Sequence, residues 1–291
     1  MKRRKFFKYT AMTAGALSIS PYVKMFPGKN FFLEEKKYAN DIVTLGKTGI
    51  KVSRLAVGTG TNGFAHRSDQ TDELGISGLA SLLIAAYDNG INFWDSADSY
   101  GTHPHLKEAL KHIKRDKVVI LTKTHATTAD EMKSDLERYL KELGTDYIDI
   151  LLLHLMRSPD WPKEKEGAME VLEKARKDGI IRAHGVSCHT IEALEAASNS
   201  DWVQIDLARI NPEGARMDDE VSVVTKVLKK MHKQGKGIVG MKVFGGGRLT
   251  DKPDECLRFV LGLDFVDAFT IGQESKSQML DLVKRIPEMS S

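Results

Sequence analysis

Cysteine is scarce in this 291-residue chain, which contains only Cys188 and Cys256. Two thiols cannot form a disulfide framework, a four-thiolate metal site or an iron–sulfur cluster within one chain. Low-complexity segments and sequence repeats are absent too, and the apolar stretch at residues 9–19 is too short and too polar to span a membrane. With 41% hydrophobic and 29% charged residues, the chain has the composition of a globular protein with a sizeable core.

An excess of basic charge is missing from most of the chain, although its formal net charge is +3. Residues 1–30 carry seven basic side chains and no acidic one, so the remainder is slightly acidic. A mildly acidic body offers no surface for a nucleic acid. We therefore expect no nucleic-acid partner, and nothing in the sequence predicts a protein partner.

The N-terminus has the features of an export signal. Basic residues, Arg3-Arg4-Lys5-Phe6-Phe7-Lys8, precede the short apolar stretch, which is typical of a secretory signal, and the paired arginines resemble a twin-arginine signal. We predict a leader and linker over residues 1–38, a folded domain over 39–291, and a periplasmic location. No cleavage site is evident, so an uncleaved leader would tether the protein to the membrane, and a non-functional leader would leave it in the cytoplasm.

Short apolar runs alternate with helical patterns from residue 41 onward. A small hairpin is expected at 42–45 and 50–52, around the turn Gly46-Lys47-Thr48-Gly49. The predicted strands after it are 54–58, 92–95, 118–122, 148–153, 181–186, 202–206, 238–242 and 267–271. The predicted helices are 73–89, 103–113, 129–143, 165–178, 190–199, 218–234, 252–262 and 275–286.

The strand cores indicate a parallel sheet. Runs such as Val118–Leu121 and Ile150–Leu153 are apolar throughout, which is typical of strands buried on both faces. Eight strand–helix units of this kind, with no internal domain boundary, fit one α/β domain. We therefore predict a (β/α)8 TIM barrel preceded by a short β-hairpin.

Four ionisable side chains follow or end three neighbouring strands. Asp95 ends the second strand and Tyr100 follows it, Lys123 ends the third, and His154 follows the fourth. Active sites of such barrels gather at the C-terminal ends of the strands, so these groups should meet. Each alone has a structural explanation, as a turn cap, a buried ion pair or a core histidine. Together they are less easily explained in that way, because burying such groups costs several kcal/mol unless they are paired.

Their chemistry is that of a proton donor with supporting groups. A phenol with a pKa near 10 is a weak acid at neutral pH, and an adjacent ammonium lowers that pKa. Asp95 would hold Lys123 charged and oriented, while His154 would donate a hydrogen bond to a substrate oxygen and position it against Tyr100. The set has no source of electrons, so a cofactor must supply them.

In these residues and their spacing, the sequence resembles the aldo-keto reductase family. The residues that carry the resemblance are Asp95-Ser-Ala-Asp-Ser-Tyr100-Gly, Lys123 after strand three and Leu151-Leu-Leu-His154. Further matches extend the resemblance over nearly all of residues 41–286. It implies that Tyr100 donates the proton, that Lys123 and Asp95 tune it, and that His154 orients the carbonyl. It also implies hydride transfer from a nicotinamide cofactor.

The resemblance implies cofactor-binding residues as well. Ser187 and Gln204 would hold the nicotinamide carboxamide, and the loop after strand seven, with Lys242 and Gly245, would approach the phosphates. Two departures affect this half of the site. Cys188 stands where the family usually has Asn, so one carboxamide contact is lost or moves to His189. Met241 stands where an aromatic side chain often stacks on the nicotinamide.

The segment after the eighth strand bears on the choice between NAD and NADP. Gly272-Gln-Glu-Ser-Lys-Ser-Gln278 lacks the Lys-Ser…Arg pattern that grips a 2′-phosphate in NADP-specific members. Glu274 would suit a free ribose hydroxyl, as acidic residues do in other dinucleotide sites. Lys276 leaves the choice open, so we expect NADP or NAD, with Gly272, Glu274 and Gln278 near the nucleotide.

Two other motifs suggest different functions. Gly58-Thr-Gly60-Thr-Asn-Gly63 fits G-x-G-x-x-G, but no helix opens there and no acidic residue stands about 20 positions on, so we interpret it as the loop after strand one, lining the pocket. His103, His105 and His125 could belong to a metal-dependent barrel hydrolase. Yet Pro104 suits the first turn of a helix, which would direct both neighbouring histidines away from the barrel centre.

These observations predict an oxidoreductase that uses NAD(P)H to reduce an aldehyde or ketone to an alcohol, or catalyses the reverse. No metal is expected. Two alternatives stay open at this stage: the metal-dependent hydrolase, and a barrel that binds nicotinamide nucleotide as a sensor without turnover. The substrate itself is not encoded in any recognisable motif.

Overall fold

The structure is a computed structural model that describes residues 36–290. The predicted leader and linker therefore lie almost entirely outside the described residues. Between residues 36 and 290, none of the helices combines the length and apolarity that a membrane crossing requires.

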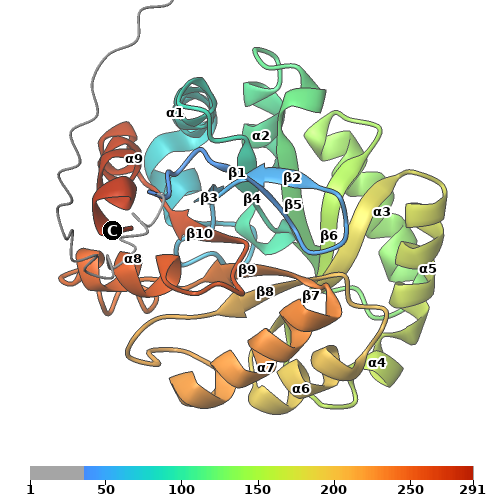
Figure 1. The fold of residues 1–291 in the computed structure, drawn as a ribbon. Coiled ribbons are helices and arrows are strands. Elements are labelled where there is room, and N and C mark those ends of the chain that lie inside the picture. Colours follow the sequence, from blue (N-terminus) through green and yellow to red (C-terminus); the bar gives the residue numbers. More distant parts are fainter. Residues whose placement is uncertain (1–35, 291) are drawn as a thin grey trace, which may run out of the picture. The chain divides into compact units, whose positions relative to one another are not determined.

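Eight parallel strands close into a barrel, as the apolar runs predict (Figure 1). The order around the barrel is β10-β3-β4-β5-β6-β7-β8-β9, so the first strand of the barrel pairs with the last. The strands are β3 (Leu55–Gly58), β4 (Phe93–Asp95), β5 (Val119–Thr124), β6 (Ile148–Met156), β7 (Ile181–Cys188), β8 (Ile205–Arg209), β9 (Gly237–Met241) and β10 (Ala268–Gly272).

A ring of helices surrounds the barrel (Figure 1). They are α1 (Asp69–Asp88), α2 (His103–Ala109), α3 (Ala129–Leu143), α4 (Trp161–Glu164), α5 (Glu166–Lys177), α6 (Ile191–Asn199), α7 (Val221–Gln234), α8 (Pro253–Leu261) and α9 (Lys276–Met289). A 3-10 turn, η1 (Asp98–Tyr100), follows β4, and a second one, η2 (Arg115–Lys117), precedes β5. Sequence punctuation explains many of the helix ends. Thr128 and Glu131 form a capping box at the start of α3, and Gly144 ends that helix in the left-handed conformation.

The hairpin of β1 (Ile42–Thr44) and β2 (Lys51–Ser53) closes one end of the barrel. Leu45, Ile50 and Val52 pack into the cluster that fills the barrel interior. The backbone of Lys47 donates to Gly235 just before β9, which places the hairpin at the end where the strands begin. The opposite end, where the strands finish, is left for the functional site.

Apolar side chains form two layers. Inward-facing residues such as Phe93, Leu121 and Leu152 fill the barrel, and a larger cluster lies between the strands and the helices. Cys188 belongs to this outer cluster and is fully buried, and that burial raises the pKa of its thiol well above the ordinary value. It therefore packs as a small apolar residue.

Among the barrel strands, β8 differs most from its prediction. Residues 202–206 are expected to form it, but β8 runs from Ile205 to Arg209. Arg209 can end a buried strand because its guanidinium binds Asp218, with Nε 2.8 Å from Oδ1. Such a partner from a later loop is not visible in the local pattern. Trp202 instead stacks on His184, which explains the apolar residues before the strand.

Candidate active site

Adjacent strands bring the four predicted catalytic residues to one end of the barrel. Asp95 is the last residue of β4, and its register partner in β5 is Leu121, two residues before Lys123. Lys123 pairs in register with Leu152 of β6, two residues before His154. Tyr100 follows β4 in η1. The sequence therefore placed all four residues near the same rim.

The Lys123 ammonium is fully buried and has partners. Its Nζ lies 2.5 Å from Oδ1 of Asp95 and donates to the backbone oxygen of Ser96 at 2.6 Å. Burial alone would lower the pKa of Lys123, but the Asp95 carboxylate and the Tyr100 phenol together raise it above its usual value. The side chain is thus a fixed positive charge at the base of the site.

The Tyr100 ring lies beside this charge, with Nζ of Lys123 4.7 Å from the ring centroid. The sequence led us to expect a lowered phenol pKa. Instead, burial raises the pKa of Tyr100, and the opposing effect of Lys123 is smaller. The phenol is therefore protonated over the whole neutral range. That is the form required of a proton donor.

His154 faces Tyr100 edge-on, with ring centroids 5.9 Å apart and planes at 85°. On its other side it stacks on His125 at 4.7 Å. Burial, with the nearby Lys123 charge, lowers the pKa of His154 well below its usual value, so the imidazole is neutral. A neutral imidazole beside the phenol can donate one hydrogen bond to a substrate oxygen.

The predicted carboxamide residues Ser187 and Gln204 are not brought together. Ser187 is buried near the end of β7, and its Oγ accepts a hydrogen bond from the backbone of Leu155 at 3.0 Å. Gln204 precedes β8 at the opposite end of the barrel, where its Oε1 accepts from the His184 backbone at 3.3 Å. Its own backbone oxygen accepts from Gly237, the first residue of β9.

The loop after β9 is consistent with the prediction of a phosphate-binding segment. Lys242 is half-buried in the left-handed conformation, with φ of 56°, and burial together with Arg216 lowers its pKa. Gly245, Gly246 and Gly247 all have positive φ, which few other residues tolerate. Next to Gly247 there is room for an added Cβ with no atom within 4 Å.

The segment after β10 begins helix α9. Gly272 is the last residue of β10. The backbone of Glu274 donates to Oε1 of Gln278 at 2.7 Å, and the backbone of Gln278 donates to the cap residue Ser275. Gln278 thus stabilises the helix start, and Glu274 is half-buried beside it.

Sequence reasoning missed Gln273 and the polar groups on β8. Gln273 is fully buried next to Gly272, and neither polar atom of its amide has a hydrogen-bond partner among the described residues. An orphaned amide of this kind, with Lys242 and the glycine loop, fits a nucleotide that supplies polar partners. Asp206 is also buried, with no hydrogen-bond partner for its carboxylate within residues 36–290. Its neighbours Ile205 and Leu207 face the barrel interior, so its side chain lies on the outer face of β8. Nothing in the local sequence distinguishes either residue from an exposed one.

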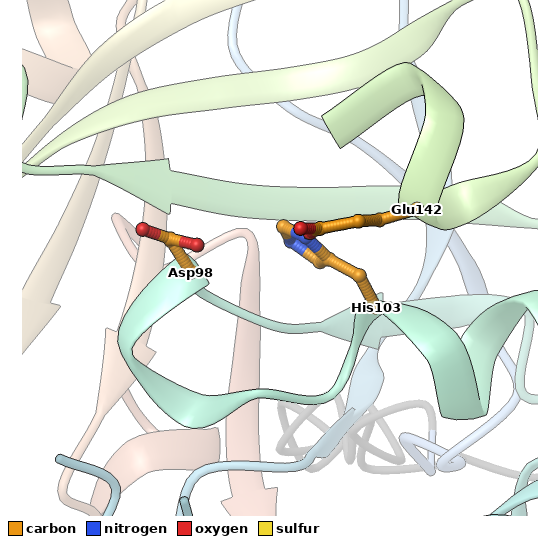
Figure 2. Close-up of side chains that lie close together, drawn as sticks. All are labelled: Asp98, His103 and Glu142. Carbon is orange, nitrogen blue, oxygen red and sulfur yellow. The ribbon is translucent and has the colours of Figure 1, made fainter. Parts of the chain in front are cut away.

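Between residues 36 and 290, one group of three residues with metal-binding side chains has its ligand atoms within 4.8 Å of one another: Asp98, His103 and Glu142 (Figure 2). His103 is buried between Glu142 at 2.8 Å and Thr122 at 2.7 Å. Arg138 already bridges the two carboxylates, with Nη1 2.6 Å from Asp98 and 3.2 Å from Glu142. The guanidinium thus supplies the positive charge that a metal would bring. His105 and His125, the other residues of the metal hypothesis, are not in this group.

Comparisons with a family model and with known proteins point to the same family. Residues 55–262 match the model of the aldo/keto reductase family. Over 170 residues the chain is 32% identical to the aldo-keto reductase YhdN of Bacillus subtilis, covering 53% of this chain and 49% of that protein. Over 234 residues it is 26% identical to a D-threo-aldose 1-dehydrogenase of a Pseudomonas species, covering 69% and 68%. The chain thus spans between about half and two thirds of these relatives.

The fold is shared with solved structures. An aldo-keto reductase from Bacillus halodurans, in its holo form, superimposes with a TM-score of 0.69 at 19% identity. The match covers 87% of this chain and 91% of the other. At this identity the similarity concerns the barrel itself.

Proposed function

The chain belongs to the aldo/keto reductase family, and from this premise we propose that it reduces an aldehyde or ketone to an alcohol with NADPH or NADH, or catalyses the reverse. The observation that carries the proposal is the contact set around Tyr100. A buried, paired ammonium lies 4.7 Å from its ring centroid and a neutral imidazole faces its edge. These are the groups that proton transfer to a carbonyl oxygen requires.

Each residue has a separate part in this reaction. Tyr100 gives its hydroxyl proton to the carbonyl oxygen, and the phenolate left behind is stabilised by Lys123 and later takes a proton from water. Asp95 keeps Lys123 charged and in place. His154 hydrogen-bonds the same carbonyl oxygen and orients it. A reduced nicotinamide, when bound, would supply the two electrons as a hydride.

The cofactor half of the proposal relies on fewer contacts. Lys242, the glycine loop at 245–247 and the Gln273 amide are the residues we expect to hold the nucleotide. Ser187 remains a candidate for the carboxamide. Gln204 is too far along the barrel, and Cys188 packs in the outer cluster, so neither replaces the usual amide contact. We expect the choice between NAD and NADP to follow Glu274 and Lys276.

The experiment is to follow NADPH and NADH oxidation with a panel of reactive aldehydes. Tyr100→Phe should lower turnover by about three orders of magnitude while leaving coenzyme binding intact. Tyr147→Phe is the matched control, because Tyr147 stacks on Arg115 near the start of the barrel strands. Unchanged turnover in Tyr100→Phe, or a protein that binds neither coenzyme, would refute the proposal. Coenzyme binding without turnover on any carbonyl would favour a sensor.

We also propose export by the twin-arginine route, on the residues of the leader alone. This route carries folded proteins, so a tightly held coenzyme could travel with the enzyme. Replacing Arg3 and Arg4 by Lys should retain the protein in the cytoplasm, as measured by cell fractionation. An unchanged distribution would contradict the export signal.

A further inference from the structure

The loop after β3 contains the motif Gly58-Thr-Gly60-Thr-Asn-Gly63, whose spacing resembles that of a dinucleotide-binding loop but whose surroundings do not. Gly58, Gly60 and Gly63 follow or end a strand, but helix α1 begins only at Asp69. The structure shows a different use for two of these glycines. Both lie directly against the ring of Tyr100.

The two glycines contact opposite edges of that ring. A Cβ added at Gly60 would lie 2.2 Å from Cε2 and 2.4 Å from Cδ2 of Tyr100. One added at Gly63 would lie 2.3 Å from Cδ1 and 2.8 Å from Cε1. Neither glycine has the left-handed φ that would itself call for glycine. The close approach of the aromatic ring is therefore the physical reason for glycine at both positions.

The loop that carries these glycines is firmly held. Gln70 of α1 accepts from the backbone of Thr61 at 3.0 Å and donates to its hydroxyl at 2.7 Å. Gln70 is itself fully buried. A loop fixed by a buried side chain cannot easily retreat from an added methyl group, so the ring of Tyr100 would have to move instead.

The loop also grips the turn on which Tyr100 sits. The ring of His66 contacts the backbone oxygen of Asp98 at 3.0 Å, and the Thr59 hydroxyl lies 3.0 Å from that of Thr102. A Cβ at Gly101 would lie 2.1 Å from the backbone oxygen of His66. Loop 59–67 and turn 98–102 therefore interlock on both sides of Tyr100.

Three residues of the loop adopt a strained conformation. Asn62, Ala65 and His66 have φ values of 50°, 51° and 59°. Left-handed backbone is unfavourable for residues other than glycine, so the surrounding contacts must offset this strain. A strained loop that is held in one shape is a rigid support.

We propose that Gly60 and Gly63 are positioning residues, forming a platform that sets the direction of the Tyr100 hydroxyl. The proposal rests on the role of Tyr100 as proton donor. Without the platform the ring would stay beside Lys123 but turn or shift relative to a substrate oxygen. A shift of about 1 Å is enough to lower a reaction rate by about 100-fold.

The first test compares Gly60→Ala and Gly63→Ala with wild type in coenzyme binding and steady-state turnover. We expect kcat to fall by about 10- to 100-fold, with coenzyme Kd within about twofold. Because proton transfer becomes slower, the solvent deuterium isotope effect on kcat should rise. Unchanged kcat in both folded variants would overturn the proposal, as would an equal loss of coenzyme binding.

Gly179→Ala is the matched control. Gly179 has φ of 77° and open space around it, so alanine strains the backbone without touching any neighbour. It lies just before β7, at the end of the barrel away from Tyr100. The midpoint of this variant's urea denaturation should fall while kcat stays unchanged. A comparable loss of kcat in this control would mean that general destabilisation explains the effect.

The second test is independent of activity. Urea denaturation measures the free energy of unfolding. Gly60→Ala should lower it when Tyr100 is present, and should lower it much less in a Tyr100→Ala background, because the ring is gone. Equal destabilisation in both backgrounds would show that the contact between Gly60 and the Tyr100 ring, on which the proposal depends, does not exist. If the wild type shows no carbonyl turnover, the proposed function fails and the positioning role with it, while this cycle still decides whether the steric contact exists.

Discussion

The two sides of the barrel mouth differ in how their polar groups are satisfied. On the side of β4, β5 and β6, the buried charge of Lys123 is paired with Asp95 and hydrogen-bonded to the backbone of Ser96. On the side of β8, β9 and β10, Gln273 has an unpaired amide. The side-chain ammonium of Lys242 there has no hydrogen-bond or ion-pair partner within residues 36–290, and only its backbone oxygen is hydrogen-bonded, to Asn211 and Gly245. On the first side the buried ammonium is satisfied without a ligand, and Nδ1 of His154 is the one buried side-chain polar atom of the four proposed catalytic residues that has no partner within residues 36–290. The second side offers an amide and an ammonium that a ligand would complete.

Under the proposed function, this difference corresponds to a division between proton transfer on the first side and coenzyme binding on the second. Paired groups keep their geometry before any substrate arrives, which favours a fixed proton donor. Unpaired buried groups raise the free energy of the unliganded protein and regain it on binding. Variants on the first side should therefore change kcat, and variants on the second should change coenzyme affinity.

The largest effect is expected for Lys123→Met. It removes the charge beside Tyr100 and leaves the Asp95 carboxylate buried alone, so kcat should fall by about 1,000-fold and stability by about 3–5 kcal/mol. Steady-state kinetics and urea denaturation measure the two. Adding Asp95→Asn should restore much of the stability and none of the rate. Full activity in Lys123→Met would break the comparison.

A smaller effect on the other side is expected for Lys242→Met. Losing one charge-assisted contact should weaken coenzyme binding by about 10-fold. At saturating coenzyme, kcat should stay within about twofold, and titration of coenzyme fluorescence gives the affinity. Lys226→Met, on the exposed face of α7, is the control. A fall in kcat with unchanged affinity would place Lys242 among the catalytic groups.

Asp206→Asn tests the unpaired carboxyl on β8 through stability alone. Burial, with Asp218 nearby, raises the pKa of Asp206 well above its usual value. The folded protein then holds a proton that the unfolded chain loses above about pH 4, so wild-type stability falls as pH rises toward the folded pKa.

The variant cannot show this loss, so its stability relative to wild type should grow with pH, by at most about 1.4 kcal/mol per pH unit. Urea midpoints measured between pH 4 and pH 8 give the slope. Asp251→Asn, at an exposed position, should leave the pH dependence as it is in wild type. A constant difference between Asp206→Asn and wild type would show that Asp206 does not titrate in this way.

The smallest effect is expected for Gln204→Ala. The family resemblance makes Gln204 a carboxamide ligand, but its side chain binds the His184 backbone where β8 begins. Coenzyme affinity should therefore change by less than about twofold, as for a substitution away from the site. A large loss of affinity, measured by the same fluorescence titration, would contradict the placement of the Gln204 side chain at the start of β8, away from the coenzyme.

The barrel, and the convergence of the four proposed catalytic residues on one of its rims, were accessible from sequence for a physical reason. Strands such as Ile148–Met156 are largely apolar because they are buried on both faces, so their position and order are encoded locally, although β6 continues past its predicted end at residue 153. Lys123 and His154 interrupt such runs, which marks them as paired or functional. The (β/α)8 architecture with its N-terminal hairpin is confirmed.

Other features depend on contacts between distant segments. Both ends of β8 were predicted three residues early, because Trp202 stacks on His184 before the strand and Asp218 from a later loop stabilises Arg209 at its end. The pKa of Tyr100 was expected to fall, but burial under a loop 40 residues earlier outweighs the charge of Lys123. The contact of Gly60 with that ring has no local signature either. Packing of this kind becomes visible only in three dimensions.

The hairpin that closes the barrel has a consequence for how the chain folds. Its backbone at Gly46 donates to Asp267, and β3 pairs along its length with β10, so the first strands are completed by the last. These contacts span more than 200 residues, which makes closure a late event with a high entropic barrier. Until α8 and β10 have emerged from the ribosome, β3 keeps an open edge that a chaperone or a second chain could pair with. The order of synthesis therefore delays sealing of the barrel until its C-terminal strands are available.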